Sequence, residues 1–139
     1  AVDAIARQDD WTEGCASPPT CIKVTVRSPD WAGVAWQHPA NNWGEQPGGF
    51  DLSNARFLVF RVRADQPIPG MKFGAGLIEG EPHSDSLKRE KTVDLSETWQ
   101  TIRIKLRGDR SQLITGFWWV APMTARKETT FYIDDIRFE

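Results

Sequence analysis

The segment Arg56-Phe-Leu-Val-Phe-Arg-Val-Arg63 has the residue pattern of a β-strand with one apolar face. Side chains alternate between the two faces of a β-strand, so Leu58, Phe60 and Val62 share one wholly apolar face. The opposite face carries Arg61 and Arg63. This pattern is typical of a half-buried strand, and it predicts that the two arginines lie on an open sheet surface.

The same alternation of apolar and polar residues recurs along the chain, whereas the spacing of an amphipathic helix does not. About eight such strands without crossover helices favour antiparallel pairing, and two packed sheets bury strands that are apolar on one side. We therefore predict an all-β, two-sheet β-sandwich of the jelly-roll type, a single domain over residues 1–139. Residues 1–20 are predicted as an irregular N-terminal arm with room for one edge strand. The predicted strands are 22–26, 31–36, 56–63, 71–79, 91–95, 99–106, 114–121 and 129–139.

Size and charge limit the function classes that fit. The chain has 139 residues, a formal charge of −2 and basic residues spread along the sequence, so we predict no nucleic-acid partner. No apolar run approaches the roughly 20 residues of a membrane span, so we predict no membrane partner. The start, Ala1-Val-Asp-Ala4, has no signal-peptide pattern, and we expect any targeting signal to have been removed or to lie outside this sequence.

The two cysteines, Cys15 and Cys21, are close in sequence. Neither a Cys-x-x-Cys motif nor a pair of neighbouring histidines accompanies them, which argues against a metal site. We predict a short-loop disulfide and hence a secreted or extracytoplasmic protein. The alternative is a pair of reduced, partly buried thiols.

Tryptophan is concentrated in one segment. Three of the seven indoles lie between residues 31 and 43, beside the amides of Gln37 and Asn42. A ring can hold the apolar face of a sugar while amides bond its hydroxyl groups, so this segment suits carbohydrate recognition. The alternative is that Trp31 and Trp36 fill the sandwich and only Trp43 is exposed.

A second aromatic group, Phe117-Trp-Trp119, would place at least one indole away from the core of a strand. Arg61 and Arg63 are candidate partners for sugar hydroxyls, and the alternative is that they are ordinary solvated charges. The predicted carbohydrate-binding residues are Trp36, Gln37, Asn42, Trp43, Arg61, Arg63, Trp118 and Trp119.

Four segments together resemble jelly-roll carbohydrate-binding modules of the galactose-binding-like superfamily. They are Phe131-Tyr-Ile-Asp-Asp-Ile136, Gly116-Phe-Trp-Trp-Val120, the stretch 51–64 and Trp99-Gln-Thr-Ile-Arg-Ile104. The resemblance covers residues 22–139. It implies a noncatalytic module, usually attached to a glycoside hydrolase domain, that binds a plant or microbial polysaccharide or oligosaccharide. The ligand would lie across a concave sheet face or at the loop edge.

Many members of that superfamily carry a structural calcium held by the final strand and the N-terminal segment. Carried over here, the resemblance implies Asp134 or Asp135 as a ligand, with Asp3, Asp9, Asp10 or Glu13 as partners. The sequence itself breaks its alternation at Asp134-Asp135, which predicts a bulge that could aim a carboxylate at a cation. The alternative is an aspartate that pairs with an arginine or caps a turn.

An enzyme is the least favoured class. Glycoside hydrolysis needs two facing carboxylates, and Glu79, Glu81 and Asp85 have no recognisable spacing. No nucleophilic triad is visible around the two histidines. The leading interpretation is a secreted, monomeric, noncatalytic module for a β-glucan-type polysaccharide. The alternatives are a structural or protein-interaction sandwich whose tryptophans form an interface, and a small glycan-active enzyme.

Overall fold

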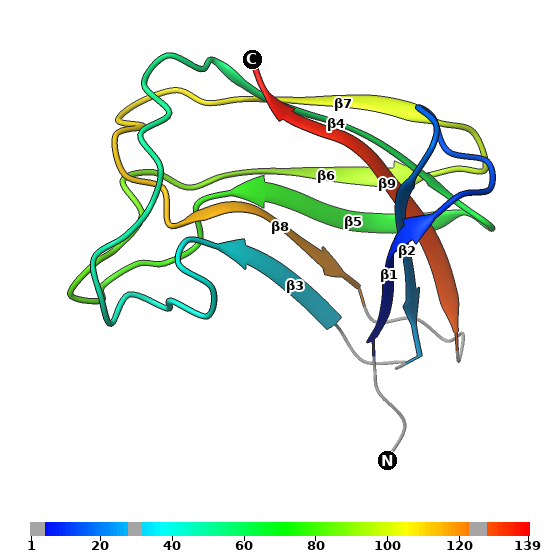
Figure 1. Ribbon diagram of the computed structural model, residues 1–139, viewed down its shortest axis with the longest axis horizontal. Coiled ribbons are helices and arrows are strands. Elements are labelled where there is room, and N and C mark those ends of the chain that lie inside the picture. Colours follow the sequence, from blue (N-terminus) through cyan, green and yellow to red (C-terminus); the bar gives the residue numbers. More distant parts are fainter. Residues whose placement is uncertain (1–4, 28–31, 123–127) are drawn as a thin grey trace.

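The computed structural model describes residues 5–27, 32–122 and 128–139, and these form two antiparallel sheets packed face to face (Figure 1). No helix within these residues is long and apolar enough to cross a membrane. Sheet A has five strands, in the order β1 (Ile5–Trp11), β2 (Cys21–Val26), β9 (Thr129–Phe138), β4 (Phe57–Ala64) and β7 (Gln100–Lys105). Sheet B has four strands, in the order β3 (Ala32–Gln37), β8 (Thr115–Ala121), β5 (Ile68–Ala75) and β6 (Arg89–Leu95). The predicted all-β sandwich is confirmed.

The core forms where the apolar faces of the two sheets meet. Leu58, Phe60 and Val62 of β4 are completely buried, as their alternation predicts. The ring of Phe60 lies 4.9 Å from that of Phe73 on β5 and 5.1 Å from that of Phe117 on β8. Burying a side chain of this size contributes about 1.5–3 kcal/mol, so this contact between the sheets is a main source of stability.

The N-terminal arm contains the edge strand for which the prediction left room: β1 lies at the edge of sheet A and pairs only with β2. One predicted strand has different limits. Strand β5 ends at Ala75 rather than continuing to residue 79. Gly76 has a φ of 75°, and a Cβ atom there would lie 1.8 Å from the carbonyl oxygen of Leu87, so the chain must leave the sheet at a glycine.

Two long loops project together from one end of the sandwich, and we call residues 38–50 and 76–88 the end lobe (Figure 1). The backbone N–H of His83 donates to the carbonyl of Gly44 at 3.0 Å, which joins the two loops. The lobe therefore places side chains from both loops beside the end of β3.

The carboxylate of Asp85 fastens the end lobe to sheet B. One oxygen accepts the N–H groups of Leu77 and Ile78 at 2.7 and 2.8 Å, and the other accepts those of Ile114 and Thr115 at 2.6 and 3.1 Å. A single side chain thus satisfies four backbone donors from two segments.

Candidate functional site

An apolar hollow of the described surface, about 320 Å³ in volume, opens between the two sheets, and we call it the aromatic groove. It lies between edge strand β3 of sheet B and the last residues of β9 in sheet A. Strand β2 pairs with β9 only as far as Ile133, so the side chains beyond that residue have no neighbouring strand on this side. The groove is lined by Trp36, Gln37, Phe50, Gly116, Phe117, Ile136 and Phe138.

Aromatic rings form the walls of the groove. Phe50 is 46% exposed, and its ring stacks on that of His38 at 4.7 Å. Trp36 is half-buried and packs against Phe117, with ring centroids 5.3 Å apart. The guanidinium carbon of Arg7 lies 5.3 Å from the Trp36 ring, which places a cation at the groove margin.

Gln37 supplies a polar group inside this apolar lining. The pairing of β3 with β8 shifts register between Trp36 and Gln37, so both side chains reach the same hollow. The Nε2 atom of Gln37 is buried, and within the described part of the chain it has no hydrogen-bond partner. A buried donor without a partner costs roughly 1–3 kcal/mol, and a ligand oxygen would satisfy it.

The loop after β3 contains two residues predicted to contact a sugar, Asn42 and Trp43, and they lie in different surroundings. Trp43 is 48% exposed and lies in the end lobe, outside the lining of the groove. Asn42 is completely buried, where its Oδ1 accepts the N–H of Gly44 at 3.0 Å and its Nδ2 donates to the carbonyl of Gln46 at 2.9 Å. This placement corrects the interpretation of Asn42, whose amide shapes the loop instead of facing a ligand.

The consecutive indoles on β8 point to opposite faces of sheet B, as predicted. Trp119 is completely buried and meets Phe131 edge-on at 5.0 Å, so it belongs to the core and the prediction of a sugar contact is corrected. Trp118 lies on the outer face but is only 3% exposed, and its Nε1 donates to the carbonyl of Gly76 at 2.9 Å. A side chain so covered offers little surface for stacking.

Arg61 and Arg63 lie on the outer face of sheet A, as their position in β4 predicts, but neither lines the aromatic groove. The guanidinium carbon of Arg63 lies 4.1 Å from the ring of Tyr132 and 5.4 Å from that of Trp99. The Nε of Arg61 lies 3.6 Å from an oxygen of Asp135. Both arginines therefore make contacts within the protein.

A covering loop, residues 12–20, explains why this outer face is partly closed. The Cys15–Cys21 disulfide is present, in agreement with the sequence prediction, and it closes this loop. The indole of Trp99 donates to the carbonyl of Gly14 at 3.0 Å, which anchors the loop above Arg63. Burial and the hydrogen bond to Asp65 raise the pKa of Tyr132 beneath this loop.

The predicted bulge at the aspartate pair is present. Asp135 has a φ of 53°, and the pairing of β9 with β4 shifts register beside it. Asp134 accepts the backbone N–H of Ser17 at 2.8 Å, and Asp135 accepts the Ser17 hydroxyl at 2.7 Å. The bulge thus aims both carboxylates at the covering loop.

The donor set around this bulge does not fit calcium, which takes six to eight oxygen ligands. Within the described residues, the close group of possible ligands is Cys15, Cys21 and Asp134, and both sulfur atoms belong to the disulfide. Asp9 lines a hollow beside the aspartate pair but forms an ion pair with Arg7 at 3.0 Å. Asp3 lies outside the described residues, and calcium stays a prediction.

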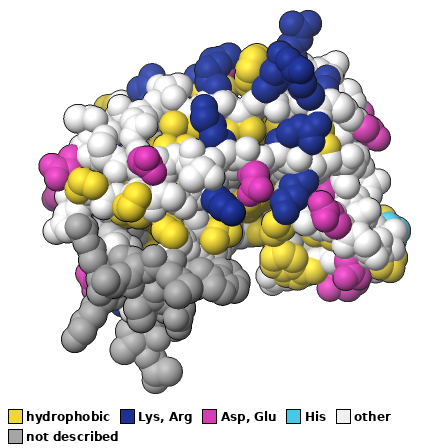
Figure 2. Space-filling model, turned by 180° about the vertical axis from the view of Figure 1, so that it is seen from behind, with side chains coloured by type: hydrophobic (Ala, Val, Ile, Leu, Met, Phe, Trp, Pro, Cys, Tyr) yellow, Lys and Arg dark blue, Asp and Glu magenta, His cyan; other side chains and the backbone are white. Residues whose placement is uncertain are grey.

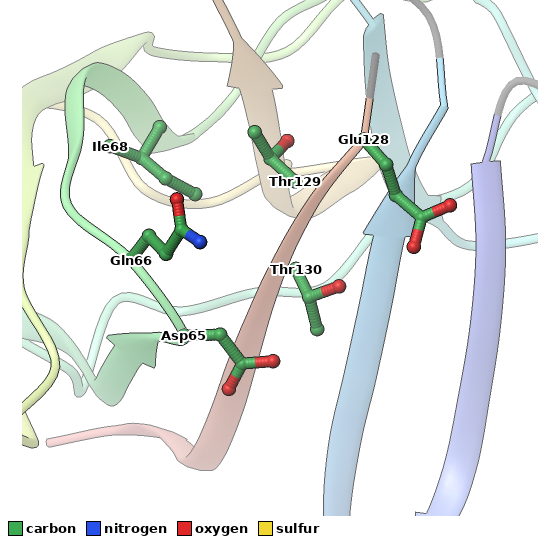
Figure 3. A pocket seen from close by; sticks show the side chains of 6 residues that line it. All are labelled: Asp65, Gln66, Ile68, Glu128, Thr129 and Thr130. Carbon is green, nitrogen blue, oxygen red and sulfur yellow. The ribbon is translucent and has the colours of Figure 1, made fainter. Parts of the chain in front are cut away.

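Another hollow, about 180 Å³ in volume, holds two carboxylates on either side of β9 (Figure 3). Asp65 accepts the Tyr132 hydroxyl at 3.2 Å and lies 3.7 Å from Arg63. Glu128 points away from Asp65 and lies 3.8 Å from Arg27. Each carboxylate thus has a neighbouring cation of its own.

Six residues of the groove and its rim were not predicted as sugar contacts: Arg7, Phe50, Gly116, Phe117, Ile136 and Phe138. Phe50 gave a usable signal, because it is a lone aromatic residue between Gly49 and Asp51 in a loop of turn-forming residues. The others gave none, because they reach the groove only through strand pairing across the sandwich.

No protein-family model and no curated protein matches the sequence. Among solved structures, the chain resembles a family 30 carbohydrate-binding module of a cellulosomal cellulase of Clostridium thermocellum. The TM-score is 0.66 at 16% identity, over 96% of this chain and 81% of that one. It also resembles a family 11 carbohydrate-binding module from Clostridium thermocellum, solved with a β-1,3-1,4-mixed-linked tetrasaccharide. That TM-score is 0.65 at 11% identity, over 96% of this chain and 81% of the other.

Another similar structure is an exo-β-agarase, with a TM-score of 0.64 and 11% identity over 98% of this chain. The match spans 23% of the agarase chain, so the same fold occurs there as one part of a longer protein. At these identities the likeness is one of fold. The chain has the two-sheet β-sandwich fold of carbohydrate-binding modules.

Proposed function

We propose that this protein is a noncatalytic carbohydrate-binding module that binds a β-glucan-type polysaccharide at the aromatic groove. The observation that carries the proposal is the exposed ring of Phe50 beside the unpartnered amide of Gln37 in an apolar hollow. The shared fold with modules of a cellulase, and with one solved with a mixed-linked tetrasaccharide, supports this class of ligand.

The groove offers the two interactions that a sugar ring needs. The face of Phe50 that is turned away from His38 can stack on the C–H groups of a pyranose. The Nε2 of Gln37 can donate to a hydroxyl group, and Arg7 adds a cationic donor at the margin. An open groove along the edge of the sandwich fits a chain better than a single sugar.

Affinity electrophoresis tests the proposal. Gels that contain cellulose derivatives, mixed-linkage glucan, xyloglucan, xylan or mannan would be run beside gels without polysaccharide. We expect retardation in at least one β-glucan gel, and a protein unretarded in every gel would contradict carbohydrate binding.

Two exposed aromatic residues then locate the site. Phe50→Ala should abolish most of the retardation, because it removes the stacking surface with little loss of packing. Trp43→Ala is the matched variant, since Trp43 is equally exposed in the same loop but lies outside the groove lining. Loss of retardation with Trp43→Ala alone would place the site at Trp43 and contradict the groove.

A Gln37→Leu variant tests the polar contact. Leucine keeps much of the volume of Gln37 and removes its unpartnered donor, so the variant should be at least as stable as the wild type but bind less tightly. If the groove is instead a protein interface, Gln37→Leu and Phe50→Ala would alter a concentration-dependent dimer seen by sedimentation, with no effect of sugar.

The cellular setting is part of the same proposal. The Cys15–Cys21 disulfide supports an oxidising, extracytoplasmic location. The similar modules occur in a cellulase and within a long agarase chain, which supports attachment to a glycoside hydrolase domain. In that arrangement the module would hold the enzyme close to its substrate.

A further inference from the structure

Basic side chains gather along the edge of the sandwich where β6 and β7 lie in contact. We call this the basic edge, and it consists of Lys88, Arg89, Lys91, Arg103, Lys105 and Arg107. Residues 88–107 hold these six cations and three carboxylates, whereas the whole chain has 17 Lys and Arg against 19 Asp and Glu. Figure 2 shows Lys and Arg side chains gathered over the upper half of the rear face, where β6 and β7 run.

The strands explain how residues spread in the sequence come together. Arg103 and Lys105 alternate with buried residues of β7, so both point outward and lie about 7 Å apart along the strand. Lys91 is exposed on β6, the edge strand of the other sheet. The fold therefore corrects the sequence interpretation that basic residues are not clustered.

Arg89 joins the start of β6 to the residues that follow β7. Its guanidinium donates to the carbonyl of Lys88 at 2.8 Å and to the carbonyl of Arg107. These bonds hold Lys88, Arg89 and Arg107 close together at one end of the basic edge.

Most cations of the basic edge have no anionic partner within the protein. Arg103 pairs with Glu139 at 3.3 Å, but Lys88, Lys91, Lys105 and Arg107 form no ion pair among the described residues. These four unpaired cations lie on or beside two contacting strands, and such a group attracts a partner that presents several negative charges.

We propose that the basic edge binds an anionic polysaccharide, a linear chain that carries carboxylate or sulfate groups. Such a chain laid along β7 would bring successive acidic groups near Arg103, Lys105 and Arg107. Double-stranded DNA carries a charge every ~1.7 Å and is bound by strongly basic domains, whereas this protein has a net charge of −2. The sparser charge of an acidic glycan suits a single short row of cations.

Protection of the sheet edges does not account for the whole feature. Lysines on edge strands prevent pairing with another sheet, and Lys91 and Lys105 serve that purpose as well. Lys88 and Arg107 lie outside the strand limits, where no edge needs protection. Binding of a polyanion accounts both for the lysines on the edge strands and for the cations beside them.

Charge variants test the basic edge separately from the aromatic groove. Lys91→Gln/Lys105→Gln removes two unpaired cations from the edge. Lys23→Gln/Arg27→Gln removes the same amount of charge from β2 and its end as a control, although Arg27 is paired with Glu128 and Lys23 contacts the ring of Trp11. Each protein would be run in gels that contain a polyuronate, a sulfated galactan or a neutral β-glucan. We expect the edge variant to bind the acidic chain about tenfold more weakly, with the control near wild type.

Salt and competitors complete the test. Binding to the acidic chain should vanish in about 1 M salt, where the Debye length is about 3 Å, and retardation by the neutral glucan should persist. Comparison of the polyuronate and sulfated gels identifies the acidic group. The proposal is overturned if no acidic chain retards the wild type, if both double variants weaken equally, or if single-stranded DNA is retained while acidic glycans are not. None of these results bears on the aromatic groove, which Phe50→Ala tests in neutral glucan.

Discussion

Replacement of Asp85 by asparagine should unfold the end lobe from sheet B and destabilise the protein severely. The wild-type carboxylate accepts four backbone N–H groups, two at each oxygen. Asparagine has one carbonyl oxygen, which can keep two of these bonds. Its NH₂ group would then face the other two donors, which are left without an acceptor.

The loss follows from those two bonds. A hydrogen bond to a charged acceptor contributes about 1.5–3 kcal/mol, so Asp85→Asn should reduce the free energy of unfolding by roughly 3–6 kcal/mol. Domains of this size are stable by about 5–15 kcal/mol, so the variant keeps only part of its stability. The expected fall in the melting temperature is roughly 10–20 °C.

Urea unfolding followed by tryptophan fluorescence measures this loss. The transition midpoint should fall while the slope stays near the wild-type value, because the same surface is exposed on unfolding. Asp94→Asn is the matched control, since the Asp94 carboxylate accepts a single exposed bond, from Gly70 at 3.0 Å, which an amide oxygen can keep. A loss below about 1 kcal/mol in Asp85→Asn would show that these four bonds do not hold the lobe in solution.

Three further predictions concern the covering loop and the residues beneath it. Tyr132 is the only tyrosine, and burial followed by its bond to Asp65 raises its pKa, so an alkaline absorbance titration should give a midpoint above 10, the ordinary value. The buried, neutral Tyr132 side chain therefore contributes its full stabilisation below the ordinary pKa, and this stabilisation is lost as the pH rises through the raised pKa. A midpoint at the ordinary value would contradict the buried contact. Reduction of the Cys15–Cys21 disulfide should lower the free energy of unfolding by about 2 kcal/mol in urea, and an unchanged midpoint would show that the loop is held without it. Addition of calcium should leave the melting temperature unchanged, because Ser17 already bonds one oxygen of Asp134 and one of Asp135 and few other oxygen ligands lie beside them, and a rise that chelator reverses would contradict this.

Most of the fold could be predicted from the sequence, because the alternation of side chains along a strand is a local property. The burial of Leu58 and the opposite orientations of Trp118 and Trp119 follow from the two-residue period alone. The alternation could not tell whether an outward face is open. Trp118 is outward yet covered, because the chain beyond β5 returns across it at Gly76.

The candidate site was harder to predict, because it depends on which segments meet. Trp36 and Gln37 were identified from their own neighbourhood, but Phe138 reaches the groove through the position of β9 in sheet A. Asp85 offered no sequence signal that distinguishes a structural carboxylate from a catalytic one. Its structural role is shown only by its four backbone partners, which lie up to 30 positions away in the sequence.

The position of β9 sets the order in which the protein can fold during synthesis. Among the described residues it is the last of nine strands in sequence order, yet it lies in the middle of sheet A, between β2 and β4. The pairs β1–β2 and β4–β7 can form before it is synthesised, but sheet A becomes continuous only with β9. Most close residue pairs join residues far apart in the sequence, a topology that folds slowly. Until β9 is in place, the edges of β2 and β4 that pair with it stay open, and unpaired strand edges make a folding intermediate prone to aggregation.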